Sequence, residues 1–170
     1  SVPLNLSVSE DALANMIEDS GASALFCTTD QAERVDQSPP LSRATNGLTK
    51  VSDQRQGDWT EYHAWREAQS DAPLDISLDP ETPLNIIYSS GTTGLPKGIV
   101  HTQRGRKDWA SDLSVALRYH GAARTLITIG MYSNISWVSM LCTALAGGTL
   151  VIEPRFDPVD FWRVTDAEQI

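Results

Sequence analysis

The chain has few cysteines, few basic residues and no long apolar run. Its two cysteines, Cys27 and Cys142, belong to no CxxC pair or Cys/His cluster, so we expect buried, reduced thiols and a cytoplasmic protein. No apolar run approaches the roughly eighteen residues of a membrane span, and the first residues do not resemble a signal peptide. The formal net charge of −9 argues against nucleic acid or an anionic membrane as the partner of the whole surface.

The charges are distributed unevenly along the chain. Residues 1–81 hold fifteen acidic and five basic side chains, whereas residues 82–107 hold no acid and four cations, Lys97, Arg104, Arg106 and Lys107. One interpretation is a local positive field that attracts an anion. The other is that Arg104, Arg106 and Lys107 belong to the solvated start of a helix.

The most informative stretch runs from Leu84 to Thr102 and reads LNIIYSSGTTGLPKGIVHT. Its first part, Leu84–Tyr88, is apolar with β-branched and aromatic members, which predicts a buried strand. Apolar residues return at Ile99 and Val100, which predicts a second strand. A polar, glycine-rich loop therefore lies between two strands.

The composition of this loop suits an anion. Gly91 and Gly94 can adopt backbone angles closed to other residues and let amide groups approach a ligand, while Lys97 supplies a compact positive charge. Four hydroxyl groups add further donors, those of Ser89, Ser90, Thr92 and Thr93. These residues predict a cradle for a polyphosphate. The alternative is an ordinary glycine-rich surface hairpin.

A Walker-type phosphate loop does not fit the same residues. In the register that starts at Gly91, Pro96 stands where the second glycine should be and Gly98 stands where the metal-binding hydroxyl should be. The residues after the loop also predict a strand, whereas a Walker loop opens a helix. We therefore exclude a P-loop nucleotidase.

The other expected elements indicate an α/β fold. Helix and strand patterns alternate, which predicts a partly parallel sheet with helices on both faces in a single partial domain over residues 1–170. Residues 30–82 are expected to form an irregular excursion within it, apart from a short helix after Asp58. The remaining helices are expected at 8–20, from 104 to about 120, over most of 131–147 and after Asp157, and the remaining strands at 24–28, 125–129 and 149–152.

Two segments resemble one known family. YSSGTTGLPKG is similar to the signature loop of the AMP-forming acyl-CoA synthetase, adenylation-domain and luciferase superfamily, and PLNLSVSEDALANMIEDSGASALF resembles an earlier segment of the same proteins. The resemblance implies an enzyme that joins a carboxylic acid to ATP, releases pyrophosphate and passes the acyl group to coenzyme A, with Mg²⁺ as a further cofactor. It also implies that these 170 residues are a fragment of the large N-terminal domain, without the C-terminal domain and the rest of the parent chain. We expect this fragment to be inactive alone.

The resemblance assigns roles to particular residues. It implies that Ser89 and Ser90–Gly94 hold the phosphates of ATP, and that Lys97 offsets their charge during catalysis. The segment GMYSNISWVSM is similar to the aromatic motif beside the acid pocket, which implies substrate contacts from Tyr132, Asn134 and Trp137. Ser133 departs from the pattern, because many members have His there. His101 matches a position where members often have His, which implies that it also contacts the substrate.

Purely structural interpretations also remain for these residues. Tyr132 and Trp137 are also explained as core aromatics, and His101 as a structural hydrogen-bonding residue. A nucleotide-binding module without chemistry, a structural piece with an empty loop, and an adenylation domain of a peptide synthetase remain alternative functions. No metal-ligand cluster is evident in the sequence, so we assign no metal-binding residue.

Overall fold

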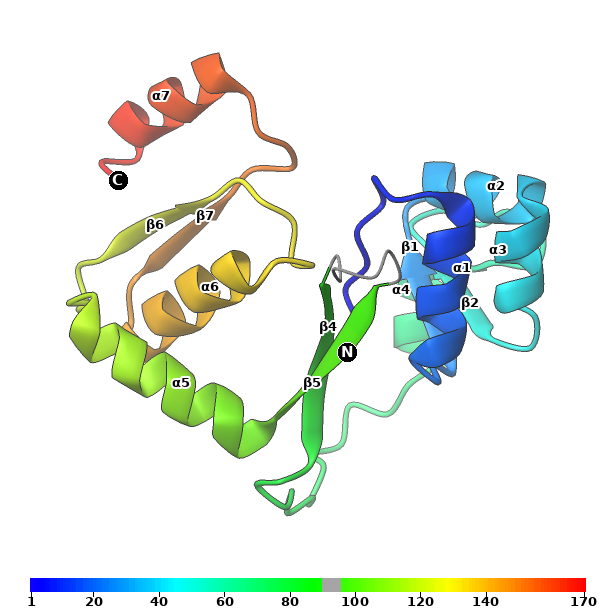
Figure 1. Cartoon of the computed structure of the whole chain (residues 1–170), viewed down its shortest axis with the longest axis horizontal. Helices are drawn as coiled ribbons and strands as arrows, with labels where there is room; N and C mark the ends of the chain where they lie inside the picture. The colour runs from blue at the N-terminus through cyan, green and yellow to red at the C-terminus, as the bar shows by residue number, and fades with distance from the viewer. Residues whose placement is uncertain (90–95) are drawn as a thin grey trace. The chain divides into compact units, whose positions relative to one another are not determined.

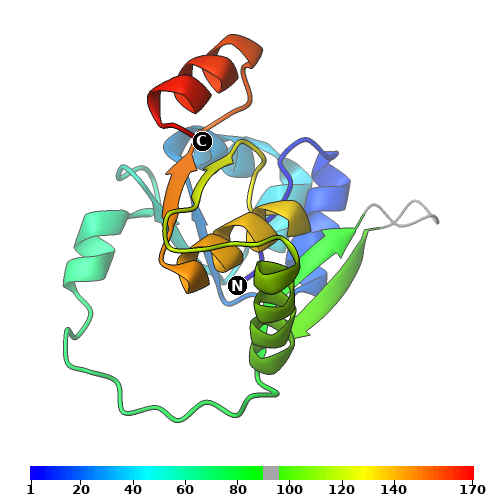
Figure 2. The same cartoon turned by 90° about the vertical axis from the view of Figure 1, so that its left-hand side faces the viewer.

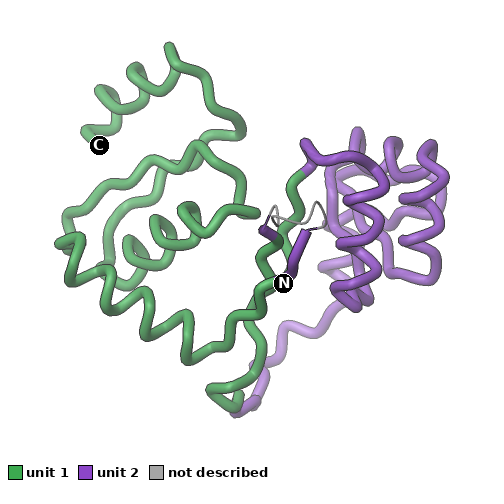
Figure 3. The backbone as a smooth tube through the Cα atoms, viewed as in Figure 1, with its two compact units in different colours: residues 1–5, 78–88, 99–170 green, residues 6–77, 89–98 purple. Residues whose placement is uncertain are grey.

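The structure is a computed structural model that describes residues 1–89 and 96–170. Its contacts divide the chain into two compact units, which Figure 3 shows in different colours. Unit 1 comprises Ser1–Asn5, Leu78–Tyr88 and Ile99–Ile170, and unit 2 comprises Leu6–Ser77 and Ser89–Gly98. The expectation that both belong to one larger domain stays a prediction.

Unit 2 is built around a small parallel sheet. Its elements in chain order are α1 (Glu10–Asp19), β1 (Ala24–Cys27), α2 (Thr29–Gln37), α3 (Pro39–Ala44), β2 (Thr49–Ser52), β3 (Thr60–Glu61) and α4 (Tyr62–Glu67) (Figure 1). The strand order is β1-β2-β3, and both pairs are parallel. Phe26 lies opposite Val51, which in turn lies opposite Thr60.

The first helix follows its apolar pattern. Leu13, Met16 and Ile17 recur at helical spacing and are buried on one face of α1, which packs against α3. The helix starts two residues later than expected, because the N-cap is Ser9, whose hydroxyl oxygen accepts from the amide of Ala12 at 3.3 Å.

The expected irregular excursion over residues 30–82 is wrong where α2, α3, β2 and β3 lie, whereas the short helix expected after Asp58 is present as α4. Helix α2 has only Ala32 and Val35 on its buried face, too few apolar residues to produce a visible period. Pro39 and Pro40 do not interrupt this region, because they occupy the first turn of α3, where a missing N–H costs nothing. Residues 68–82 contain no helix or strand.

Trp59 forms part of the core of unit 2 and does not belong to the expected aromatic helix. It is 2% exposed, its indole Nε1 donates to the Asp36 carboxylate at 3.0 Å, and the Lys50 ammonium lies 5.5 Å from the ring centroid. Helix α4 begins only at Tyr62 because Glu61 caps it. Satisfying the indole N–H inside the core fixes Trp59 in one orientation.

Unit 1 contains the remaining elements. They are most of β4 (Pro83–Ser89) and β5 (Lys97–Thr102), then α5 (Gln103–Ala116), β6 (Arg124–Ile127), α6 (Asn134–Ala146), β7 (Thr149–Ile152) and α7 (Pro158–Ala167). Strands β4 and β5 are hydrogen-bonded neighbours. Strands β6 and β7 are parallel, with Leu126 opposite Val151, and α6 connects them as a crossover helix.

Helix α6 packs on both β6 and β7 and on α5, as both views of the chain show (Figures 1 and 2). The α/β class with parallel strand pairs is therefore confirmed. The helix expected from residue 104 to about 120 is present as α5, but its buried residues are Arg106 and Ala110, and Leu117 is more than half exposed. This buried arginine is the feature on which the candidate site is built.

Both cysteines are free thiols. Cys142 is buried as expected, and its thiol donates to the Ala110 carbonyl oxygen at 3.4 Å. Cys27 was also expected to be buried but is only half-buried. Among the helices in residues 1–89 and 96–170, none combines the length and the hydropathy that crossing a membrane requires.

Candidate functional site

The two strands that border the predicted phosphate loop end in exposed polar side chains. Ser89 is the last residue of β4 and Lys97 the first of β5. Both side chains are exposed, and Lys97 forms no ion pair with any acid in the described residues. An exposed ammonium group without an acidic partner can bind an anion. The other predicted phosphate ligands, Ser90, Gly91, Thr92, Thr93 and Gly94, lie outside the described residues.

His101 lies further along β5, in unit 1, and is partly buried. Its Nε2 atom is buried and has no hydrogen-bond partner in the described part of the chain. Burial lowers the pKa of His101 below its ordinary value, and repulsion from the positive charge of Arg106 lowers this pKa further. The neutral imidazole is therefore the form favoured at neutral pH.

Arg106 joins two elements of unit 1 through its guanidinium group. The residue is only 2% exposed. Its Nε donates to the side-chain oxygen of Asn85 in β4 at 3.0 Å, and its Nη2 donates to the side-chain oxygen of Asn134 at 2.8 Å. Since Asn134 is the first residue of α6, the guanidinium fixes the start of this helix against β4.

Two tryptophan rings lie beside the same guanidinium. Its central carbon is 4.8 Å from the ring centroid of Trp109 and 5.3 Å from that of Trp137. Trp137 is buried, and its indole Nε1 donates to the Met131 carbonyl oxygen at 2.8 Å. Aromatic faces attract a cation, so both rings help to stabilise the buried positive charge.

No carboxylate neutralises Arg106 within the described residues, because it forms no ion pair there. Burial alone lowers the pKa of its guanidinium. The group nevertheless stays charged at neutral pH, because an arginine titrates far above it. A positive charge is thus held in the interior of unit 1 by amide oxygens and aromatic rings.

The segment between β6 and α6 is held by its own hydrogen bonds. The Ser136 hydroxyl donates to the Ile129 carbonyl oxygen at 2.7 Å. The Ser133 hydroxyl oxygen caps α6 by accepting from the amide of Ile135 at 3.3 Å. The half-buried Tyr132 ring lies against the backbone at Gly130. Ser133, the departure from the family pattern, thus has a structural role as a helix cap.

The predicted site residues fall into two groups. Asn134 and Trp137 both contact Arg106, so the structure brings these two predicted residues to one side chain. The charge of Arg106 also lowers the pKa of His101. Ser89 and Lys97 belong to unit 2. The interpretation of Trp137 as a core aromatic is confirmed as far as its burial is concerned.

Sequence reasoning missed Asn85 and Arg106. Asn85 is 1% exposed and lies on the same side of β4 as the buried Ile87, so period-two alternation within LNIIY was the available signal. Arg106 precedes the buried Ala110 by one helical turn. Arg104 belongs to a solvated helix start, as one interpretation predicted, because it is exposed and pairs with Glu81 at 2.6 Å. The same interpretation is wrong for Arg106, which is buried.

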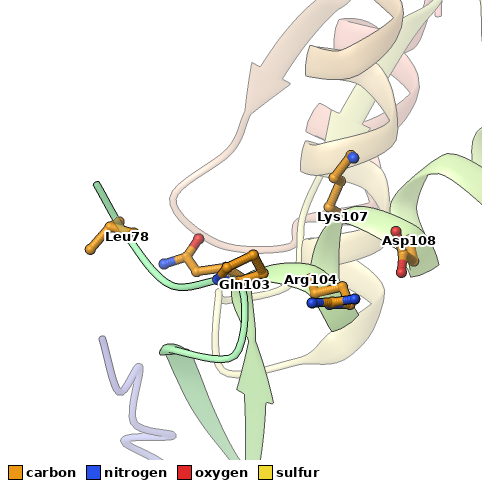
Figure 4. A pocket seen from close by; sticks show the side chains of 6 residues that line it. Leu78, Gln103, Arg104, Lys107 and Asp108 are labelled. Atoms are coloured by element: carbon orange, nitrogen blue, oxygen red, sulfur yellow. The ribbon is translucent and has the colours of Figure 1, made fainter. Parts of the chain in front are cut away.

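Two pockets lie away from the predicted site residues. One, of about 550 Å³, opens at the start of α5 in unit 1 (Figure 4) and is lined by Leu78, Pro80, Gln103, Arg104, Lys107 and Asp108. The other, of about 350 Å³, lies beside β1 and β2 in unit 2, with Phe26, Cys27 and Tyr62 among its lining residues. None of the predicted site residues lines either of them.

The described residues provide no evident metal centre. No group of three or more His, Cys, Asp or Glu side chains in residues 1–89 and 96–170 is placed to hold a metal ion. The acidic residues nearest in sequence to the predicted loop, Glu81 and Asp108, precede β4 and follow the start of α5.

Comparison with known proteins identifies relatives along the whole chain. The sequence model of the AMP-binding enzyme family matches residues 1–170. The chain is 27% identical over 177 residues to a long-chain-fatty-acid–CoA ligase of Mycobacterium tuberculosis and 31% identical over 173 residues to the indoleacetate–CoA ligase of Aromatoleum aromaticum. Each alignment covers 99% of this chain and 33% of the relative, so the chain spans about a third of their length.

A solved structure shows the same fold. The crystal structure of a long-chain-fatty-acid CoA ligase from Rhodopseudomonas palustris, described as putative, superposes with a TM-score of 0.85 at 23% identity. The superposition covers 99% of this chain and 42% of that one. With the family model matching from the first residue to the last, the chain belongs to the family of AMP-binding enzymes.

Proposed function

We propose that this chain is part of an ATP-dependent acid–thiol ligase that activates a carboxylic acid as an acyl-adenylate. The match of the family model over residues 1–170 carries this proposal. The exposed Lys97 beside the glycine-rich loop supports it, because an acid and ATP are both anions and their reaction needs positive charge nearby. The names of the two relatives, both CoA ligases, favour coenzyme A as the acceptor thiol.

The reaction itself is a displacement at phosphorus. An oxygen of the acid carboxylate attacks the α-phosphorus of ATP, the bond from that phosphorus to the bridging oxygen breaks, and pyrophosphate leaves. In this proposal Ser89 and Ser90–Gly94 hold the β- and γ-phosphates, and Lys97 offsets the charge that builds on the leaving group. The loop acts by positioning and electrostatics and forms no covalent bond.

The acid is assigned to the other group of residues. Tyr132, Asn134 and Trp137 belong to the segment that resembles the acid-pocket motif, and Asn134 and Trp137 already contact one common side chain. His101 is neutral at neutral pH, and its Nε2 has no partner among the described residues, so it is suited to donate or accept one hydrogen bond. Mg²⁺, where bound, would screen the phosphates, and no described residue is assigned to it.

Acid-dependent exchange of labelled pyrophosphate into ATP tests the proposal. The full-length protein that contains this chain is assayed with a panel of aliphatic and aromatic carboxylic acids. We expect exchange with at least one acid, and a loss of about 100-fold or more in Lys97→Ala. ATP binding without exchange for every acid would instead identify a nucleotide-binding module.

A further inference from the structure

Elements of unit 1 that are far apart in the sequence are connected through Arg106. Strand β4, which leads into the phosphate loop, contacts it through Asn85. Strand β5, which leaves the loop, carries His101, on which its charge acts. Helix α6, which follows the acid-pocket segment, contacts it through Asn134 and Trp137. Figures 1 and 2 show α5, which carries Arg106, beside α6.

Burial of Arg106 costs folding free energy, which indicates that an arginine is needed at this position. Burying a charged group without an opposite charge is unfavourable, and among the described residues Arg106 has only amide oxygens and ring faces as compensation. Only one of the two polar side-chain atoms of the buried Asn85 is hydrogen-bonded within the described chain. Its Oδ1 accepts from Arg106, whereas its Nδ2 has no partner there. An apolar residue at position 106 would fill the same space without these costs.

The geometry explains why arginine stands there. Guanidinium is a planar fork whose donors point in fixed directions, so one side chain can hold two oxygens on different elements. Here Nε takes the oxygen in β4 and Nη2 the oxygen at the first residue of α6, while the two tryptophan rings lie beside the central carbon. A lysine ammonium cannot reproduce this fixed pair of directions.

We infer that Arg106 is a positioning residue for the acid substrate: it orients Asn134 and Trp137 at the start of α6 by tying them to Asn85 of β4. This inference rests on the proposed function, because it takes Asn134 and Trp137 as walls of the acid pocket. Arg106 contacts no substrate itself. It acts on the acid through the orientation of Asn134 and Trp137.

The test compares Michaelis constants in the full-length protein. In Arg106→Met we expect the KM of the acid to rise by about 10- to 100-fold while the KM of ATP changes less than about threefold, because misplaced contacts weaken binding of one substrate. Arg104→Met is the matched control, since Arg104 lies on the same helix but is exposed and forms an ion pair with Glu81. Its KM for the acid should stay within about twofold of the wild type.

A second pair of variants separates geometry from charge and from loss of folding. Arg106→Lys keeps the charge and should still raise the KM of the acid at least about fivefold. Asn134→Ala should reproduce the effect, and the double variant Arg106→Met/Asn134→Ala should add less than about twofold to the larger single effect, because both remove one interaction. Thermal unfolding of each variant confirms that a folded protein is compared.

The outcomes distinguish the inference from the function on which it rests. Wild-type protein without acid-dependent exchange contradicts the proposed function. Wild-type exchange together with an unchanged KM of the acid in Arg106→Met, or full rescue by Arg106→Lys, contradicts the inference alone. Equal increases in the KM of the acid and of ATP would make Arg106 a general structural residue and would also contradict it.

Discussion

The Tyr132 ring packs directly on the backbone of Gly130. A Cβ atom added at Gly130 would lie 2.6 Å from Cε1 and 2.7 Å from Cδ1 of that ring, closer than atoms of these kinds approach one another. Only glycine therefore leaves the ring in its place, immediately before the start of α6.

The first prediction follows from this contact. Gly130→Ala must displace the Tyr132 ring, so we expect the KM of the acid to rise by about tenfold in the full-length protein, with the KM of ATP nearly unchanged. Steady-state kinetics with both substrates measure this. Gly121→Ala is the control, because a Cβ there meets the Ala146 carbonyl oxygen at an ordinary 3.4 Å. A KM for the acid equal to that of the wild type in Gly130→Ala would show that the ring does not contact the acid.

The second prediction concerns the turn between α6 and β7. A Cβ atom at Gly148 would lie 2.5 Å from the Ala123 carbonyl oxygen and 2.9 Å from Cγ2 of Thr143. Because the carbonyl belongs to the backbone that pairs with Thr149, it cannot move freely. We expect Gly148→Ala to destabilise the fold by about 1–3 kcal/mol, measured by chemical denaturation.

Its neighbour provides the control. Gly147 ends α6 with a φ of +75°, and a Cβ there meets no atom within 4 Å. Asn adopts this left-handed conformation more readily than other residues with side chains, so Gly147→Asn should cost less than Gly148→Ala. A greater loss in Gly147→Asn would contradict the packing argument.

The third prediction concerns the thiol of Cys27. Burial, together with the smaller effect of the negative charges of Asp30, Asp53 and Asp36, raises its pKa to about 11. The protonated thiol is therefore favoured in the folded state, and its contribution to stability is lost as the pH rises from about 9 to 11. At pH 8 we expect alkylation to be about 100-fold slower than for an ordinary thiol, since the thiolate is the reactive form.

Alkylation by iodoacetamide, followed by peptide mass spectrometry, measures this rate. Between pH 7 and 10 the rate at Cys27 should rise about tenfold per pH unit without a plateau. Denatured protein is the control and should level off near the ordinary thiol pKa of about 8.5. A plateau near pH 9 in the folded protein would contradict the raised pKa.

The fourth prediction concerns His101. Burial and, to a smaller extent, the charge of Arg106 lower its pKa, so the unfolded chain binds the proton more tightly than the folded one. This group should therefore reduce stability as the pH falls below about 6.5. NMR of labelled histidine should give a pKa below 6.5, and Arg106→Met should raise it towards that value. No change in this variant would contradict the electrostatic contact.

Local signals allowed much of the fold to be predicted. Asp157 and Pro158 predict the start of α7, where the Asp157 carboxylate accepts from the amide of Val159. The run 149–152, in which three of four residues are β-branched, coincides with β7. Helices α2 and α3 were missed because few of their residues are buried, and tertiary packing forms them in spite of a weak pattern.

The candidate site, in contrast, could not be predicted from local sequence patterns. Asn85, Arg106 and Asn134 are separated by 21 and 28 residues, and no local period reveals that their side chains meet. A polar residue within a buried strand and a cation on a buried helix face each appear unremarkable alone. Tertiary structure was needed to bring them together. The roles of Ser90–Gly94 stay predictions from the family resemblance.

The central claim is that a carboxylate oxygen attacks the α-phosphorus of ATP. The most direct measurement uses an acid with both carboxylate oxygens labelled with ¹⁸O, in the complete reaction of the full-length protein with ATP and coenzyme A. The account predicts AMP that carries one ¹⁸O atom, because that oxygen stays on phosphorus when the thiol displaces the adenylate. ¹⁸O in inorganic phosphate with formation of ADP, or AMP without label, would contradict it.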